Sequence, residues 1–467
     1  MGNSRRHFFQ SALLGAGAIA ARAGFASAAP RRSDNGPRPG GFLAVETPDV
    51  PTLGYTVENG VKVFNLLAEP VKRELVPGKI ADLWGYNGTS PGPTIEVVQG
   101  DRVRIVVDNH LPEPTSMHWH GFEIPIAMDG MVGISQPLIP PGGRFVYEFT
   151  LHQAGTFFYH SHMTMQQMMG LMGLFIMHPS APVAPPVDRD FGLVLQEWAI
   201  LPSNTVPNTL SMEFNWLSMN GRSAPATTPL IVRLGDRVRI RFANMGMDHH
   251  PIHLHGHTFY VTGTEAGRVP EAAWTPANTV LVGVAQARDI EFVANNPGDW
   301  MLHCHMPHHM MNQMASMVGP VMQAGRGIRA GMGMPEGMGM MQQGGPLSEE
   351  NGPSLGRAVG LGADYQKAAT NMPLADAAHP AESNPQQDNG HGAAQNPPGG
   401  EASSPWRVPG YPQDMMMSMD EAVAKPETWG LAPGWSGGMQ GMMTLVRVLP
   451  PHRYDQVMAR VSGARRL

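Results

Sequence analysis

Short runs in which apolar and polar residues alternate recur along the first 325 residues of the chain. Val103, Ile105 and Val107 occupy every second position of one run, which is bounded by Gly100 and Pro112. Two further runs follow turn-forming segments, residues 145–149 after 140–143 and residues 300–302 after 296–299. Alternation with a period of two predicts strands. Strands at this spacing, without helical periodicity, predict an all-β chain of Greek-key β-barrels or sandwiches.

The chain also contains an internal repeat. The matching segments are 100–105 with 235–240 (GDRVRI in both), 118–121 with 253–256 (HWHG and HLHG), and 155–162 with 298–305 (GTFFYHSH and GDWMLHCH). Matches that recur in the same order predict two copies of one structural unit. We place the first copy, module 1, at residues 46–180 and the second, module 2, at residues 186–325.

The N-terminal residues 1–28 resemble a twin-arginine signal peptide. Arg5 and Arg6 precede a short apolar run at 11–21, and small residues at 26–28 offer a cleavage site. The apolar run is too short to span about 30 Å of hydrocarbon. We therefore expect export to the periplasm or the medium, without a membrane anchor.

The C-terminal third differs in composition from the modules. Residues 326–404 are rich in Gly and Pro and hold one aromatic residue, Tyr365. Such a segment cannot bury enough apolar surface to offset its chain entropy, so we expect a disordered, low-complexity linker. Residues 405–467 regain several tryptophans and a strand-like run at 445–449, and we expect this C-terminal segment to pack on the core.

Composition narrows the possible functions. The 467 residues include 20 His and 35 Met but a single Cys, so no disulfide can form within the chain. The formal charge is −6 and no basic stripe stands out, which argues against a nucleic-acid or anionic-membrane partner. Enrichment in His and Met points to the chemistry of soft metals.

Histidines recur in four pairs with one residue between the two members. The pairs are His118/His120, His160/His162, His253/His255 and His303/His305, two in each module. Side chains at i and i+2 lie on the same side of a strand, so each pair can serve one metal cluster. Imidazoles in this number suit copper. We expect the eight to meet across a module–module interface.

Module 2 carries a second candidate site. Cys304 lies between the two histidines of the last pair and must therefore face the opposite side of the strand. With His250, His309 and Met314 it forms a His₂Cys set with a weak axial thioether, the pattern of blue-copper electron-transfer sites. The corresponding positions of module 1 are Thr115, Ser161, Gln166 and Leu171. Only module 2 should therefore hold the blue site.

In order and spacing these motifs resemble the multicopper oxidases, the laccase-like family, over residues 46–325. The resemblance implies two cupredoxin-like modules and four coppers. His118 and His253 would bind the type 2 ion; His120, His160, His162, His255, His303 and His305 the two type 3 ions; and His250, Cys304, His309 and Met314 the type 1 ion. Only 88 residues separate His162 from His250, which leaves no room for a middle domain. The chain thus resembles two-domain members, whose trinuclear clusters lie between the subunits of a homotrimer.

The resemblance also implies an activity, the one-electron oxidation of a reductant coupled to reduction of dioxygen to water. The reductant would be Cu(I) or a phenol. Methionines at 332–341 and 415–419 would recruit Cu(I), which favours a role in copper tolerance. Asp129, eleven residues after His118, would be a catalytic residue that relays protons. The alternative for Asp129 is a turn residue preceding Gly130.

Two other interpretations stay open from the sequence. One is a two-domain copper nitrite reductase, although by family pattern its blue site lies in the first module and it lacks the full set of His pairs. The other is a non-enzymatic periplasmic protein that sequesters copper through its methionines. Neither needs eight paired histidines together with a buried thiolate in the second module.

Overall fold

The computed structural model describes residues 42–200, 204–212, 214–310 and 418–464. They all belong to one unit of the chain, Arg32–Leu467. The signal-like segment 1–28, the linker 326–404 and Met314 lie outside the described residues, as do both methionine groups apart from Met419. Within the described ranges, no helix has the length and apolar character needed to cross a bilayer.

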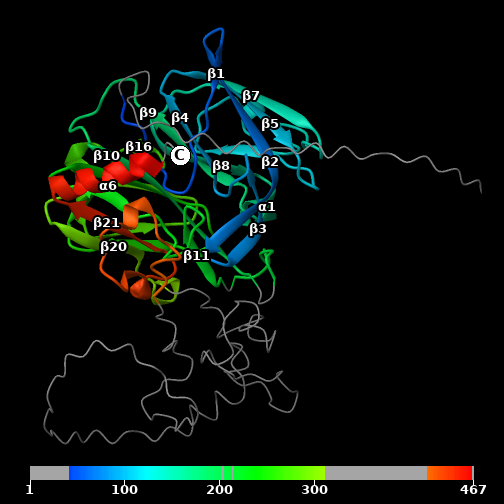
Figure 1. Ribbon diagram of the computed structural model, residues 1–467. Coiled ribbons are helices and arrows are strands. Elements are labelled where there is room, and N and C mark those ends of the chain that lie inside the picture. The colour runs from blue at the N-terminus through cyan, green and yellow to red at the C-terminus, as the bar shows by residue number, and fades with distance from the viewer. Residues whose placement is uncertain (1–41, 201–203, 213, 311–417, 465–467) are drawn as a thin grey trace, which may run out of the picture. The chain divides into compact units, whose positions relative to one another are not determined.

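Module 1 is built from two sheets (Figure 1). Side chains from both sheets belong to one hydrophobic core. One sheet contains, in spatial order, β4 (Gly92–Val98), β9 (Met172–His178), β8 (Gly155–Ser161) and β6 (Met117–His120). The other contains β1 (Thr56–Glu58), β2 (Val61–Val76), β5 (Arg102–Asn109) and β7 (Arg144–Thr150), and β3 (Lys79–Tyr86) pairs with β2. The predicted alternation is confirmed in β5, where Val103, Ile105 and Val107 are buried against Trp119 and Phe175.

Module 2 repeats this plan, and its larger sheet corresponds to the β2–β5–β7 sheet of module 1. The larger sheet runs β11 (Trp216–Met219), β10 (Arg189–Trp198), β13 (Arg237–Asn244), β19 (Ala287–Val293), β15 (Phe259–Thr264) and β16 (Gly267–Arg268), with β17 (Thr275–Ala277) pairing with β15. The second sheet runs β12 (Leu230–Arg233), β21 (Met443–Leu449), β20 (Gly298–Cys304), β14 (His250–Leu254) and β18 (Thr279–Val282). The all-β prediction is therefore confirmed, and each GDRVRI segment forms the equivalent strand, β5 or β13.

Among the described residues, the helices are short and lie between strands, except for α6, which follows the last strand. They are η1 (Ile126–Met128), α1 (Thr164–Met168), η2 (Glu271–Ala273), η3 (Pro307–Met310), η6 (Pro426–Thr428), η7 (Trp435–Gly438) and the longer α6 (Pro451–Ala464). α6 packs Val457 and Val461 against Ile231 of β12 and Leu449 of β21. It thereby covers the outside of the second sheet of module 2.

The C-terminal segment contributes a strand to the interior of module 2. All seven residues of β21 are buried, and the strand runs parallel to β12 and antiparallel to β20 (Figure 1). The sequence-based boundary of module 2 at residue 325 leaves this strand out. The expected packing of residues 405–467 on the core thus takes the form of a strand inserted into the sheet.

A buried cluster of charged and polar side chains joins the two modules. The Arg241 guanidinium of β13 donates two hydrogen bonds to Asp190 of β10, at 2.8 and 2.9 Å, and one to Thr156 of β8, at 2.8 Å. The Thr156 hydroxyl donates in turn to Asp289 of β19 at 2.7 Å. Removing one partner from a buried charge cluster of this kind is strongly destabilising, so these contacts hold the modules in register.

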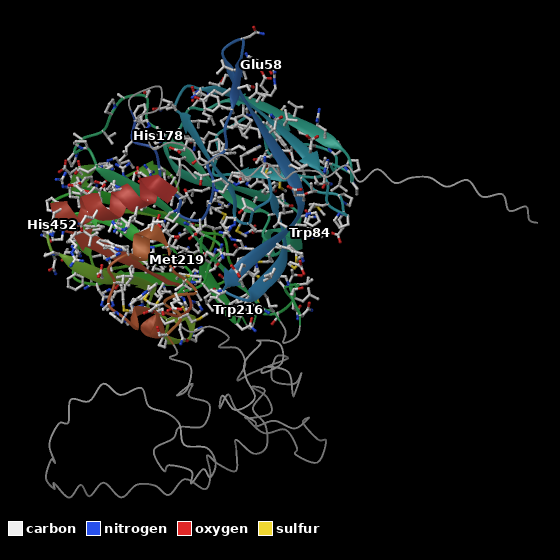
Figure 2. All side chains as sticks on the ribbon, in the orientation of Figure 1. Glu58, Trp84, His178, Trp216, Met219 and His452 are labelled. Atoms are coloured by element: carbon white, nitrogen blue, oxygen red, sulfur yellow. The ribbon has the colours of Figure 1, made fainter. Side chains whose placement is uncertain are left out.

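Apolar contacts reinforce this junction at two places. Phe158 and Leu174 of module 1 pack against Val194 of module 2 in one cluster. In the other, the long β2–β3 hairpin of module 1 reaches Trp198 and Trp216 of module 2, with Trp216 labelled at this end of the hairpin in Figure 2. The two modules therefore pack as one unit rather than as separate domains on a linker.

Within module 2, Glu291 of β19 is fully buried among three arginines. Its carboxylate accepts hydrogen bonds from Arg237 at 2.9 Å, from Arg239 at 3.0 Å and from Arg268 at 2.5 Å. Burial alone raises the pKa of a carboxyl, but here the arginines outweigh it and lower the pKa of Glu291 from 4.5 to about 2. Its ionised form therefore stabilises the fold.

Replacing Glu291 with Gln should make the protein less stable at neutral pH and less sensitive to acid. The stabilisation by Glu291 is complete above about pH 4.5 and is lost as the pH falls towards 2, and its shift in pKa corresponds to about 3 kcal/mol. We expect the free energy of unfolding, measured with urea, to differ most from wild type at pH 7 and the difference to shrink as the pH falls towards 2. Glu148→Gln, at the matching and more exposed position of module 1, should show a smaller difference.

Candidate metal centres

Three of the four residues predicted for the blue site meet inside module 2. The Cys304 Sγ lies 3.4 Å from His309 Nδ1 and 3.9 Å from His250 Nδ1, and the two Nδ1 atoms are 3.2 Å apart. All three side chains are at most 1% exposed. His250 begins β14, Cys304 ends β20, and His309 follows in η3, so strand pairing brings distant parts of the chain to one point.

The donor set fits a copper ion. Bonds of about 2.0 Å to nitrogen and about 2.3 Å to sulfur hold three donors roughly 3.5–3.7 Å apart, close to the separations seen here. Burial, with the nearby carboxylates of Glu197 and Asp248, raises the pKa of the Cys304 thiol to about 12. A thiol in this environment stays protonated at neutral pH until a metal ion binds the sulfur and displaces the proton to solvent.

Two carboxylates lie beside the imidazoles of this site, and one of them is hydrogen-bonded to its imidazole. His250 Nε2 lies 3.1 Å from Glu197 Oε2, and His309 Nε2 lies 3.4 Å from Asp248 Oδ2. Since a carboxylate accepts hydrogen bonds, His250 Nε2 carries the proton and its Nδ1 turns its lone pair towards Cys304, whereas His309 Nε2 lies near Asp248 without a hydrogen bond. Glu197 Oε1 is itself held by the backbone N–H groups of Met247 and Asp248.

No pattern in the sequence singled out Glu197. It lies near the end of β10, a strand buried at every position, and its side chain is fully buried. A carboxylate within an apolar run is the one available signal, because burying a charge requires a partner. That partner, His250, lies more than fifty residues away and is found only from the fold.

The matching position in module 1 holds a closed hydrogen-bonded triad. Thr115 Oγ1 donates to Gln166 Oε1 at 2.7 Å, and Ser161 Oγ donates to the same oxygen at 2.8 Å. The two hydroxyl oxygens lie 3.2 Å apart. These polar groups satisfy one another and include neither a thiol nor an imidazole. The asymmetry between the modules that the repeat predicted is thus visible as two different side-chain clusters at one place in the fold.

The first two His pairs form a cluster on module 1, which we call half-site 1 (His118, His120, His160 and His162). β6 pairs with β8 so that His118 lies opposite His160. The His120 Nδ1 is 3.4 Å from the His160 Nε2. Burial and the neighbouring imidazoles lower the pKa of His120 to about 4 and that of His160 to about 3, so both rings are neutral and able to bind a metal at neutral pH.

The last two pairs form half-site 2 on module 2 (His253, His255, His303 and His305). β14 pairs with β20 so that His253 lies opposite His303, and the Nε2 atoms of His255 and His303 are 3.0 Å apart. Most equivalent ring pairs have similar centroid separations in the two half-sites, although that of His118–His120 is 5.8 Å and that of His253–His255 is 4.8 Å. The centroid separations are 5.3 and 5.6 Å for His118–His160 and His253–His303, 5.2 and 5.5 Å for His118–His162 and His253–His305, and 6.2 and 5.5 Å for His160–His162 and His303–His305.

Backbone carbonyls orient the rings in both half-sites. His118 Nδ1 donates to Asp129 O and His253 Nδ1 to Asn278 O, each at 2.7 Å. The Nδ1 atoms of His160 and His303 donate to the carbonyl of the following residue, each at 2.9 Å. With Nδ1 protonated, each of these four rings presents the lone pair of Nε2, as metal-bound histidines do.

The two half-sites do not combine within one chain. Among the described residues, no hydrogen bond or ring contact links a histidine of half-site 1 to one of half-site 2. His162 and His305 are exposed, and most of the remaining rings are partly exposed. Each half-site therefore presents open imidazoles at the surface.

Asp129 lies beside half-site 1. The Asp129 carbonyl accepts the hydrogen bond from His118 Nδ1, and the Asp129 Oδ1 lies 3.5 Å from the same nitrogen. The residue also ends the η1 turn, and a Cβ at Gly130 would lie 1.8 Å from Met117 O, so the turn packs directly on β6. The proton-relay role stays a prediction, which the rate of oxygen consumption by an Asp129→Asn variant across pH would test.

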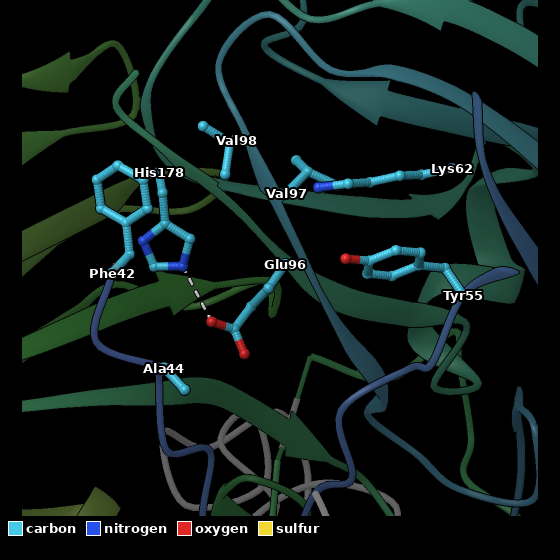
Figure 3. Close-up of a pocket in the computed structure, with 8 residues that line it drawn as sticks. All are labelled: Phe42, Ala44, Tyr55, Lys62, Glu96, Val97, Val98 and His178. Atoms are coloured by element: carbon cyan, nitrogen blue, oxygen red, sulfur yellow. Dashed lines mark hydrogen bonds and ion pairs between the residues drawn. The ribbon is translucent and has the colours of Figure 1, made fainter. Parts of the chain in front are cut away.

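A separate hollow lies on module 1, away from these histidines. Phe42, Tyr55, Lys62, Glu96 and His178 are among the residues that line it, and the His178 Nε2 is 3.0 Å from Glu96 Oε2 (Figure 3). It contains none of the predicted site residues. We assign it no part in the metal chemistry.

Known proteins share this architecture. Residues 68–182 and 201–320, together half of the chain, match two profiles that both describe a multicopper oxidase. The crystal structure of a blue copper oxidase from Nitrosomonas europaea superposes with a TM-score of 0.50 and 31% identity, covering 54% of this chain and 81% of that one.

Curated relatives cover parts of the chain. A copper resistance protein A homolog of Pseudomonas syringae is 36% identical over 32% of this chain and 25% of its own length. The multicopper oxidase MmcO of Mycobacterium tuberculosis is 28% identical over 62% of each chain. A probable nitrite reductase-hydroxylamine oxidoreductase fusion protein of Kuenenia stuttgartiensis is 28% identical over 56% of this chain and 31% of its own length. The chain thus spans between a quarter and about three fifths of these relatives. With two matching profiles, a shared fold and a donor set that fits copper, it belongs to the multicopper oxidase family.

Proposed function

We propose that this protein is an oxidase that couples four one-electron oxidations of a reductant to the reduction of dioxygen to two waters. Bound copper ions would supply the redox chemistry. The observation that carries the proposal is the arrangement of β20, whose buried Cys304 belongs to the His₂Cys site while the neighbouring His303 belongs to half-site 2. The backbone of one strand therefore connects an electron-entry site to the imidazoles proposed to hold the oxygen-reducing cluster.

The reductant is proposed to be Cu(I) or a phenol, and the role to be copper tolerance. The similarity to a copper resistance protein A homolog supports this role. The twin-arginine-like motif at residues 4–10 supports export to the periplasm, where copper enters the cell envelope. The methionine groups at 332–341 and 415–417, which would recruit Cu(I), lie outside the described residues.

Two observations weigh against the alternative functions. A nitrite reductase of the expected pattern would hold its blue site in module 1, where the Thr115, Ser161 and Gln166 side chains bond to one another instead. A copper-sequestering protein has no need of two half-sites with matching ring geometry. The partial similarity to a nitrite reductase fusion protein is compatible with a shared fold alone, because one fold can carry different activities. An activity measurement has to distinguish the two functions.

Oxygen consumption distinguishes the three functions. We expect the copper-loaded full-length protein to consume oxygen with Cu(I) or a phenol and without nitrite, one oxygen for every four electrons. The Cys304→Ser variant should lose this activity, because the His₂Cys site loses its thiolate. An oxygen electrode measures both. Nitrite-dependent turnover, or copper binding without oxygen uptake, would contradict the proposal.

We further propose that the trinuclear cluster forms between subunits of a homotrimer. Half-sites 1 and 2 have matching ring geometry, are open at the surface and are not joined within the described part of the chain. A contact between half-site 1 of one chain and half-site 2 of the next is head-to-tail, and such contacts form a closed ring when the rotation closes. Each interface of the ring would then complete one cluster.

Mixing two inactive variants tests this assembly. His160→Ala damages half-site 1 and His303→Ala damages half-site 2, so each variant alone should be inactive. Rings assembled from both chains contain interfaces at which the two half-sites are intact, roughly a quarter of all interfaces after random mixing in equal amounts. We expect refolded or co-expressed mixtures to regain about that fraction of the wild-type rate. A cluster built within one chain would give no recovery, and neither would a monomer.

Glu197 is proposed to position His250 for metal binding. It is fully buried, and Gly246 lies so close that a Cβ there would be 2.0 Å from the carboxylate, so the backbone packs directly against Glu197. Losing a hydrogen-bonding partner of a metal-bound histidine typically weakens metal binding by a factor of 10–100. Asp248 is more exposed and its contact with His309 is longer, so its contribution should be smaller.

The Glu197→Gln variant should bind copper at the His₂Cys site about 10-fold or more weakly than wild type. The amide keeps the size of the side chain but removes its negative charge. Affinity is measured by competition with a chelator, following the blue absorption of the site. Asp248→Asn is the matched control, and a loss as large as that of Glu197→Gln would argue against a specific role for Glu197.

A further inference from the structure

The module 1 triad is closed on one side by Leu171. This residue is the last before β9 and is fully buried. Its backbone N–H donates to Gln166 O at 3.2 Å, and its carbonyl accepts from the Ser161 N–H at 3.0 Å. These two bonds fix Leu171 directly beside the position where module 2 has its Cys304 and two histidines.

Met442 makes the same two backbone hydrogen bonds in module 2. Its N–H donates to His309 O at 2.9 Å, and its carbonyl accepts from the Cys304 N–H at 3.0 Å. His309 and Cys304 are the repeat counterparts of Gln166 and Ser161. Met442 therefore takes the place of Leu171.

Strand register supports this equivalence independently. In module 1, β9 pairs with β8 so that Met172 lies opposite His160. In module 2, β21 pairs with β20 so that Met443 lies opposite His303, the repeat counterpart of His160. Each last strand also runs parallel to an equivalent partner, β9 to β4 and β21 to β12. The residue before each strand, Leu171 or Met442, is thus at the same position.

Burial places the Met442 side chain on the side of the candidate site. Met442 is fully buried and belongs to the same apolar cluster as Cys304 and Ile252. The adjacent Met443 belongs to a different cluster, with Met439. Consecutive side chains of an extended chain point in opposite directions, so Met442 faces Cys304 while Met443 faces away from it.

We propose that Met442, rather than Met314, supplies the weak axial thioether of the blue site. This rests on the proposed copper site itself. A thioether is the usual fourth donor to a His₂Cys site, and the flexible Met side chain adapts to an axial position. In module 1 only residues 167–170 separate Gln166 from Leu171. In module 2 residues 310–441 separate the equivalent residues His309 and Met442. The final ligand and β21 both come from the end of the chain.

The test compares Met442→Leu and Met442→Gln with wild type, using Met443→Leu and Met314→Leu as matched controls. The reduction potential and the electron paramagnetic resonance spectrum of the copper-loaded proteins are measured. We expect all of them to stay blue, because the His₂Cys donors are kept. Met442→Leu should raise the potential, since Cu(II) loses a donor, and Met442→Gln should lower it, since an amide oxygen favours Cu(II). Both controls should match wild type.

Each outcome decides between the assignments. Opposite shifts in the two Met442 variants with an unchanged Met314→Leu support Met442 as the axial ligand. Wild-type values in the Met442 variants, as expected of an ordinary core methionine, overturn it, and so does a shifted potential in Met314→Leu. That last variant decides the question even if a Met442 variant fails to fold. A wild-type protein that binds copper without turning blue would instead contradict the proposed function.

Discussion

The alternation of side chains along β20 is the constraint on which the candidate site depends. Successive residues of a strand face opposite sides of the sheet. Cys304 therefore points into the core of module 2, while its neighbours His303 and His305 contribute to half-site 2 at the surface. A slip of one residue between β14 and β20 would exchange these directions and destroy both sites together. The close pairing of Ile252 with Cys304 and of His253 with His303 is thus a requirement of function as well as of folding.

Two copies of one module have been adapted to different tasks on this common frame. Both copies keep the strand pair that displays four histidines, and both hold the Nδ1 atoms with backbone carbonyls, which are present whatever the side chains are. The copies differ behind that strand pair, where module 1 has hydroxyl and amide groups and module 2 has a thiol, two imidazoles and a buried carboxylate. In module 1 the side chains of Thr115, Ser161 and Gln166 are hydrogen-bonded to one another, so these three buried polar groups need no metal.

Much of this arrangement was predictable from the sequence, because strands have a simple period and the repeat is plain. The all-β fold, the two modules and the convergence of Cys304 with His250 and His309 follow from local patterns. Glu197 and Met442 do not. Their partners lie far away along the chain. A Met in an apolar stretch carries no local signal, and a Glu there indicates only that a partner must exist. Met314 stands at the distance from Cys304 that the sequence pattern predicts, whereas the equivalence of Met442 with Leu171 can be found only after β21 has been placed in the sheet.

The position of β21 has a consequence for how the protein is made. Its partners β12 and β20 cannot be bridged until nearly the whole chain has been synthesised, whereas module 1 is complete much earlier and can fold first. Closing the longer loop costs little at equilibrium, about 0.6 kcal/mol for each doubling of its length. A chain that stops short of residue 443 would nonetheless keep its thiol on an unfinished sheet. Blue colour would then report that translation had passed β21.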